Sequence, residues 1–184
     1  MVCLPRALAW LLQAGALLGV VGAGLAASEP LLDEAQLLDQ LRSLGIRVHW
    51  RSECGQPGQL ATYNMGANQL CLNEGLTAQT IERSKVLHHE LVHVVQDCLD
   101  GLETSTSMSL VDGLRRAGDL TERQLNGFFL QHLREQGTIR HVVATTAPLP
   151  QDSRQREIEA YALQADPALV QHLLRESCRR RGGS

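Results

Sequence analysis

The segment from Val86 to Val95 constrains the fold of this chain more than any other part of its sequence. Most of its residues are large aliphatics: Val86, Leu87, Leu91, Val92, Val94 and Val95. Their spacing predicts a buried helix that begins near Thr77 or Thr80, whose side chains can cap it, and ends near Cys98. The sequence His89-Glu90-Leu91-Val92-His93 lies inside this helix.

Two histidines four residues apart lie on the same face of a helix, one turn from each other. His89 and His93 can therefore direct both imidazoles at one metal ion, while Glu90 lies beside them without being a ligand. A catalytic zinc site combines such histidines with a third ligand, an open coordination position and a nearby base. We expect one catalytic Zn²⁺ here, with Glu90 as the base. The alternative is two partly buried histidines on an ordinary core helix.

The third ligand has to come from elsewhere in the chain. Gln96 stands where the longer HExxHxxGxxH motif has its glycine, so that ligand set is excluded. A carboxylate on a second helix is the other common solution, and Glu157 and Glu159 lie on different faces of a predicted helix. We favour Glu157, because the small Ala160 on its face allows the two helices to approach closely. Glu159 is the alternative ligand, and a third interpretation makes both carboxylates solvated charges.

The first 27 residues have the pattern of a secretory signal peptide. A short positive segment, Met1–Arg6, precedes the apolar run Ala7–Leu25, and Gly24-Leu25-Ala26-Ala27-Ser28 at its end offers small residues for cleavage. An uncleaved membrane anchor is the alternative, since the run is almost long enough to span a bilayer. Residues 28–184 then form a single exported domain, in the periplasm, a lumen or the extracellular space.

The cysteines agree with an exported domain. Of the five, Cys3 belongs to the leader, which leaves Cys54, Cys71, Cys98 and Cys178. An even number outside the cytoplasm predicts two disulfides, and a four-cysteine zinc site lacks the paired CxxC spacing it would need. Three pairings are open. We expect Cys71–Cys98, which brackets the motif helix, and therefore Cys54–Cys178.

Composition excludes one class of partner. The net charge is −3, aromatic residues make up 3% of the chain, and no basic face is evident, so nucleic acid is not expected to bind. The basic residues at 179–181 are interpreted as a solvated terminus. We expect a monomer that acts on a protein or peptide, with membrane contact only if the leader is retained.

The remaining periodicities predict an α+β fold with a small antiparallel sheet in the N-terminal half. Strands are expected at 46–50, 60–65 and 69–72, and residues 138–143 are expected to form a further strand or an extended loop. Helices are expected at 31–44, 110–116, from the capping box Thr121–Gln124 onward, at 154–165, and from Asp166-Pro167 to about Cys178.

Together, the HExxH motif and the later Glu157-x-x-Ala160 resemble the gluzincin clan of zinc peptidases. A closer local likeness is to the mitochondrial ATP-synthase-assembly metallopeptidases, through Cys71-Leu72-Asn73, the run His89–His93, Asp97-Cys98 and the later Glu-Ile-x-Ala. This chain differs in its long insertion between His93 and Glu157 and in lacking that family's downstream cysteines.

The resemblance implies a zincin-like fold, with the sheet packed on the HExxH helix and a helical C-terminal half. It implies His89, His93 and Glu157 as zinc ligands and Glu90 as the general base in peptide-bond hydrolysis. Tyr161 or His141 is expected to donate a hydrogen bond to the oxyanion, and Asp97 could hold a ligand histidine from behind. The alternatives are a zinc-binding but non-proteolytic assembly factor and a metal-free interaction domain.

Overall fold

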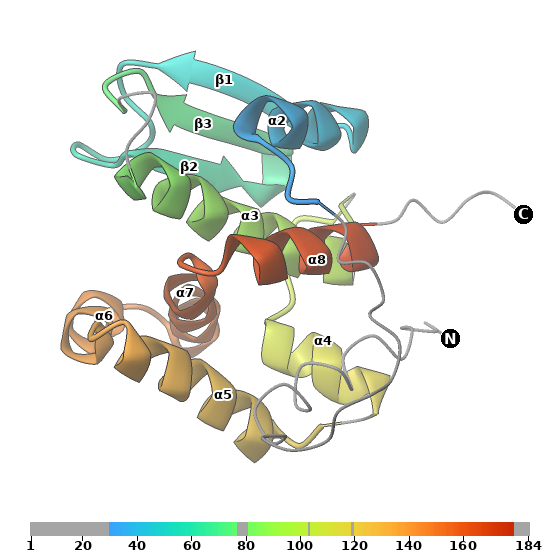
Figure 1. Ribbon diagram of the computed structural model, residues 1–184, viewed down its shortest axis with the longest axis vertical. Helices are drawn as coiled ribbons and strands as arrows, with labels where there is room; N and C mark the ends of the chain where they lie inside the picture. The colour runs from blue at the N-terminus through green and yellow to red at the C-terminus, as the bar shows by residue number, and fades with distance from the viewer. Residues whose placement is uncertain (1–29, 77–80, 103, 119, 179–184) are drawn as a thin grey trace, which may run out of the picture.

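A computed structural model describes residues 30–76, 81–102, 104–118 and 120–178. The predicted signal peptide at 1–27, the candidate caps Thr77 and Thr80, and the basic residues at 179–181 lie outside these ranges. The fold is α+β, as predicted, and largely helical (Figure 1). No helix in the described ranges is both long enough and apolar enough to cross a membrane.

The described residues form seven α-helices, three strands and one 3₁₀ turn. In chain order they are α2 (Glu34–Ser43), β1 (Arg47–Arg51), β2 (Ala61–Asn64), η2 (Met65–Ala67), β3 (Gln69–Asn73), α3 (Ile81–Asp100), α4 (Leu110–Ala117), α5 (Glu122–Glu135), α6 (Ile139–Thr146), α7 (Gln151–Leu163) and α8 (Pro167–Ser177).

The sheet is mixed, so the prediction of a wholly antiparallel sheet was wrong for one pair of strands. The strand order is β1-β3-β2; β3 is antiparallel to β2 but parallel to β1, with Val48 opposite Leu70. After β1 the chain passes to the far edge of the sheet to form β2. A tight turn then brings it back at Asn68, whose φ of 48° is left-handed, and β3 inserts between the other two strands.

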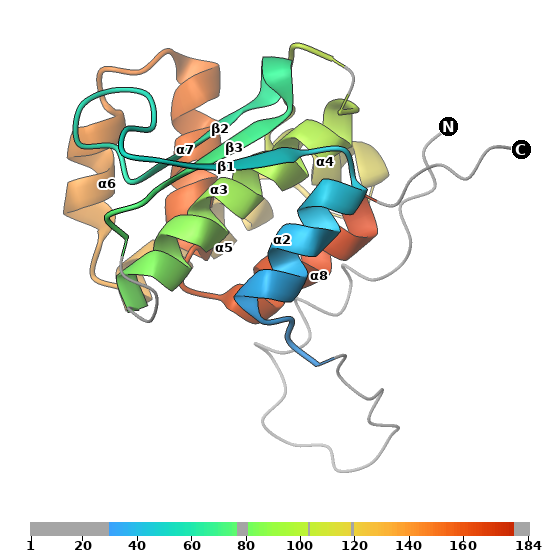
Figure 2. The same cartoon turned by 90° about the horizontal axis from the view of Figure 1, so that it is seen from above.

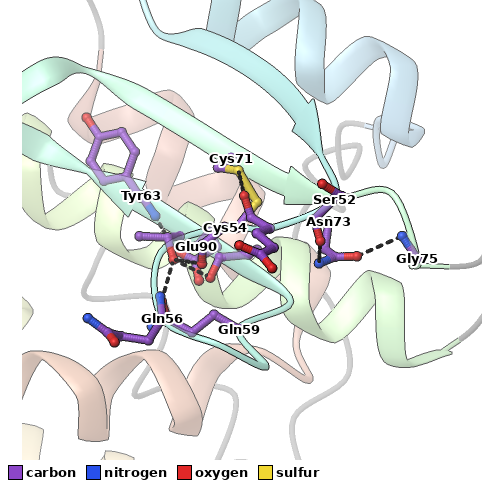
Figure 3. The surroundings of a disulfide bond; sticks show 12 residues. Ser52, Cys54, Gln56, Gln59, Tyr63, Cys71, Asn73, Gly75 and Glu90 are labelled. Carbon is purple, nitrogen blue, oxygen red and sulfur yellow. Dashed lines mark hydrogen bonds between the residues drawn. A yellow bond between two sulfur atoms is a disulfide. The ribbon is translucent and has the colours of Figure 1, made fainter.

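Both disulfides are present, but the predicted pairing was wrong. Cys54 is bonded to Cys71 and Cys98 to Cys178, with Cα–Cα distances of 5.6 and 5.1 Å. The connection between β1 and β2 passes the central strand β3, and this brings Cys54 to Cys71 (Figure 3). Cys98 lies in the last turns of α3, where that helix meets the end of α8. Two disulfides agree with an oxidising compartment.

Helix α3 is the centre of the molecule. It packs against β2 on one side and against α4, α7 and α8 on others, and the view from above shows it beneath the sheet (Figures 1 and 2). Its aliphatic residues Leu91, Val92, Val94 and Val95 are fully buried. Because α3 is covered on so many sides, its polar residues are also held inside the protein, and their contacts define the site described below.

The helical C-terminal half follows the prediction except at α6. Residues 138–143 were expected to be extended, because Val and Thr favour strands. Thr138 is instead the N-cap of α6, and the residues that follow it form a helix that buries Val142 and Thr146, one turn apart. The capping box of α5, from Thr121 to Gln124, and the Asp166 cap of α8 are confirmed.

Candidate metal centre

Helix α3 presents its two motif histidines to one cleft. The side chains of His89 and His93 are 14% and 13% exposed, and their ring centroids are 5.0 Å apart. The cleft has a volume of about 470 Å³ and is lined by α3, α7, β2 and the segment that precedes β2. This volume lies within the range of ordinary ligand sites, about 300–1,000 Å³.

Helix α7 brings Glu157 to both histidines. Its Oε2 lies 3.3 Å from Nε2 of His89, and its Oε1 lies 3.4 Å from Nε2 of His93. Ala160, one turn along α7, is fully buried where α7 packs on α3. A small residue at this position permits the close approach, as the sequence suggested. Glu157 is therefore the carboxylate that faces the histidine pair.

The spacing of these groups suits a metal ion. Zinc binds nitrogen and oxygen ligands at about 2.0–2.1 Å, which places neighbouring ligand atoms of a tetrahedral site about 3.3 Å apart. Charged hydrogen bonds between nitrogen and oxygen are shorter, about 2.7–2.9 Å. The observed 3.3 and 3.4 Å match the tetrahedral edge. All three candidate ligand atoms lie within 4.8 Å of one another, so their geometry and chemistry fit a zinc ion.

The local field also favours a cation. Burial lowers the pKa of His93, but hydrogen bonding to Glu157 and the charges of Glu90 and Glu157 outweigh it and raise the pKa to about 9. Burial likewise acts to raise the pKa of Glu157, yet hydrogen bonds from His89 and His93 bring that pKa well below its usual value. Both shifts have the direction expected where a positive charge lies beside Glu157.

Glu90 lies in the same cleft with one oxygen fixed. Its Oε2 accepts a hydrogen bond of 2.7 Å from the backbone N–H of Tyr63 in β2, and its side chain is largely buried (Figure 3). The phenol of Tyr63 in turn donates to Oδ2 of Asp97 at 2.5 Å. Tyr63 therefore contacts Glu90 through its backbone and Asp97 through its side chain.

Asp97 was considered as a residue that could hold a ligand histidine, but its side chain instead accepts a hydrogen bond from Tyr63. Gln96 occupies that position instead: its Oε1 lies 2.8 Å from Nδ1 of His93. The sequence contained the signal, because Gln96 is three residues after His93 and so lies on the same helix face.

Glu159 is neither a metal ligand nor a solvated charge. It is fully buried and points away from the cleft, where it accepts hydrogen bonds from Gln96, Gln155 and the backbone N–H groups of Leu110 and Val111. Burial raises the pKa of Glu159, and these four hydrogen bonds oppose that rise. Two carboxylates two residues apart on α7 thus face different surroundings.

Tyr161 and His141 both border the cleft. The ring of Tyr161 packs edge-on against the ring of His89, with a centroid distance of 4.7 Å. The ring of His141, from α6, has its centroid 5.9 Å from that of Tyr161. Burial and the charges of Glu157 and Glu90 raise the pKa of Tyr161. Its phenol therefore keeps its proton at neutral pH and can donate a hydrogen bond into the cleft.

Comparison with known proteins adds no further information about this site. No protein-family model, no curated protein and no solved structure matches the chain. The site is therefore interpreted from the contacts of its own residues.

Proposed function

We propose that this protein is a zinc-dependent peptidase with a gluzincin-like site on a zincin-like fold. The observation that carries the proposal is the placement of Glu157 at 3.3 and 3.4 Å from the two motif histidines, with Glu90 in the same cleft. Three ligands leave a fourth tetrahedral position open, as in catalytic zinc sites. A purely structural site would fill that position with protein and would not need Glu90 nearby.

The chain's own residues account for the proton transfers. When bound, zinc supplies Lewis acidity, which activates water and polarises a carbonyl group. Tyr63 N–H holds Oε2 of Glu90, so Oε1 is the oxygen available to accept a proton from the attacking water. Glu90 then returns this proton to the leaving amine. The phenol of Tyr161, or the imidazole of His141, donates a hydrogen bond to the developing oxyanion.

We further propose that the protein is exported and acts on exported proteins or peptides as a monomer. The apolar leader and the two disulfides support this location.

Zinc content and proteolysis, measured on the same preparations, test the proposal. The wild type is expected to hold one equivalent of zinc and to cleave an unfolded protein substrate. Glu157→Ala is expected to lose zinc, while Glu135→Ala, which removes an exposed carboxylate from α5, keeps it. Glu90→Gln is expected to retain zinc and to lose about 10²–10⁴-fold in kcat. A wild type purified without chelators that contains no zinc would refute the proposal.

A non-proteolytic zinc protein, such as an assembly factor, is the second candidate. The hydrogen bond from Tyr63 N–H gives Glu90 a structural use, which is the observation in favour of this alternative. In that case the wild type would bind zinc but would cleave no peptide bond. Glu90→Gln would then change stability alone.

A further inference from the structure

A continuous chain of buried hydrogen bonds runs from His93 to the start of helix α4. We propose that Gln96 and Glu159 act through this chain as positioning residues that fix the tautomer of His93, so that its Nε2 presents a lone pair to the metal. The inference rests on the zinc site of the proposed function but is independent of whether the protein is a peptidase.

The direction of the chain is set at Glu159. Its Oε2 accepts from Gln96 Nε2 at 2.8 Å and from Leu110 N at 2.7 Å, and its Oε1 accepts from Val111 N at 3.1 Å and Gln155 Nε2 at 3.0 Å. All four partners are N–H donors. A protonated carboxyl would need an acceptor for its own hydrogen, and none of these contacts provides one. In all four contacts Glu159 is therefore the acceptor, at the positive N-terminal end of α4.

Glu159 determines which way the amide of Gln96 points. Gln96 Nε2 lies between two acceptors, Glu159 Oε2 at 2.8 Å and the carbonyl oxygen of Arg156 at 3.0 Å. The opposite orientation would place the amide oxygen against both acceptors and leave buried groups unpaired. Gln96 is fully buried, so water cannot compensate. Its Oε1 must therefore face His93.

The orientation of Gln96 in turn determines the tautomer of His93. Gln96 Oε1 is an acceptor, so Nδ1 of His93, 2.8 Å away, has to carry the hydrogen. In the neutral imidazole, Nε2 is then a bare lone pair that faces Oε1 of Glu157 at 3.4 Å. Two acceptors in this arrangement need a proton or a metal ion between them. Hydrogen bonds of this kind raise the basicity of a ligand histidine as well as orienting it.

The affinity for Zn²⁺ alone, measured by competition with a chromophoric chelator, tests the proposal without reference to activity. Gln96→Met removes the amide at nearly constant volume, and we expect it to weaken zinc binding by about 10–100-fold. Gln155→Met is the matched control: it removes another donor to Glu159 without touching His93, and zinc affinity should change by less than about twofold. Unfolding in the presence of EDTA identifies any general loss of folding.

A substitution at Glu159 provides the second test, and it remains informative if Gln96→Met folds poorly. Glu159→Gln keeps the size of the side chain, but one of its two oxygen positions becomes an amide nitrogen that faces N–H donors, so the anchor of Gln96 is weakened and zinc affinity should fall below that of Gln155→Met. A wild type that binds no zinc would refute the proposed function. A wild type that binds zinc, with Gln96→Met or Glu159→Gln no weaker than Gln155→Met, would refute this inference alone.

Discussion

Replacing Asp97 with Asn tests the buried hydrogen bond between Asp97 and Tyr63, the residue whose backbone N–H bonds to Glu90. Asp97 is fully buried; its Oδ2 accepts from Tyr63, and no residue in the described ranges bonds to its Oδ1. Burial raises the pKa of Asp97 from 3.8 to about 6; the charge of Asp100 adds to the rise and the hydrogen bond from Tyr63 opposes it. The ionised form is therefore costly in the folded protein.

The sign and size of the effect follow from this pKa. Because the folded-state value lies above the unfolded one, the stabilising contribution of Asp97 is present below about pH 4 and is lost as pH rises through about 6. A rise of roughly two pKa units corresponds to about 3 kcal/mol of unfolding free energy. Asn does not titrate. Its amide adds a cost of about 1–3 kcal/mol where Oδ1 was unpaired, and that cost does not depend on pH.

Urea unfolding, followed by far-ultraviolet circular dichroism in EDTA, gives the required difference. The unfolding free energy of Asp97→Asn minus that of wild type should rise by up to about 3 kcal/mol between about pH 4 and 7. Asp152→Asn, at an exposed position in the first turn of α7, is the control for replacing a carboxyl group by an amide. If the Asp97→Asn difference were flat, or fell with pH, the argument that a buried carboxylate supports Tyr63 would be wrong.

Three further predictions concern the fold around the site. Removing the Cys98–Cys178 disulfide, with a sequence separation of 80, should cost about 1.3 kcal/mol more in urea unfolding than removing Cys54–Cys71, with a separation of 17; equal costs would contradict the loop-entropy estimate. Ala160→Leu should lower the thermal midpoint by the equivalent of about 1–3 kcal/mol and weaken zinc binding, because it separates α3 from α7; unchanged affinity would show that close approach is not needed. Free zinc at 100 times its dissociation constant should stabilise the metal-free protein by about 2.7 kcal/mol, and EDTA should reverse this in a melting experiment.

Local features of the candidate site could be predicted from sequence, because they depend on spacing along one helix. His89 and His93 had to share a face once α3 was recognised as a helix. Glu157 was identified because Ala160 marked a face of α7 able to approach another helix. The contact between Gln96 and His93 follows from the same rule, because residues three apart on a helix share a face. These inferences needed no knowledge of how distant segments meet.

Features set by distant contacts could not be predicted in this way. The cysteine pairing depends on the path of the chain past β3, and that path cannot be deduced from the local pattern of apolar residues. The parallel pairing of β1 with β3 has the same origin. Residues 138–143 formed a helix because burial of Val142 against the helical half outweighed their intrinsic preference for a strand. Likewise, the separate roles of the α7 carboxylates depended on where α4 begins.

The buried polar residues of α3 explain why one helix can carry the whole site. Glu90, Gln96 and Asp97 are each at least nine-tenths buried; Glu90 and Asp97 bond to the backbone and the side chain of Tyr63 in β2, and Gln96 bonds to α7. An apolar helix with two histidines would pack equally well, but nothing would fix the histidine tautomer or the base. Buried polar groups cost free energy unless they are paired. Their pairing with neighbouring elements therefore couples the geometry of the metal site to the fold itself.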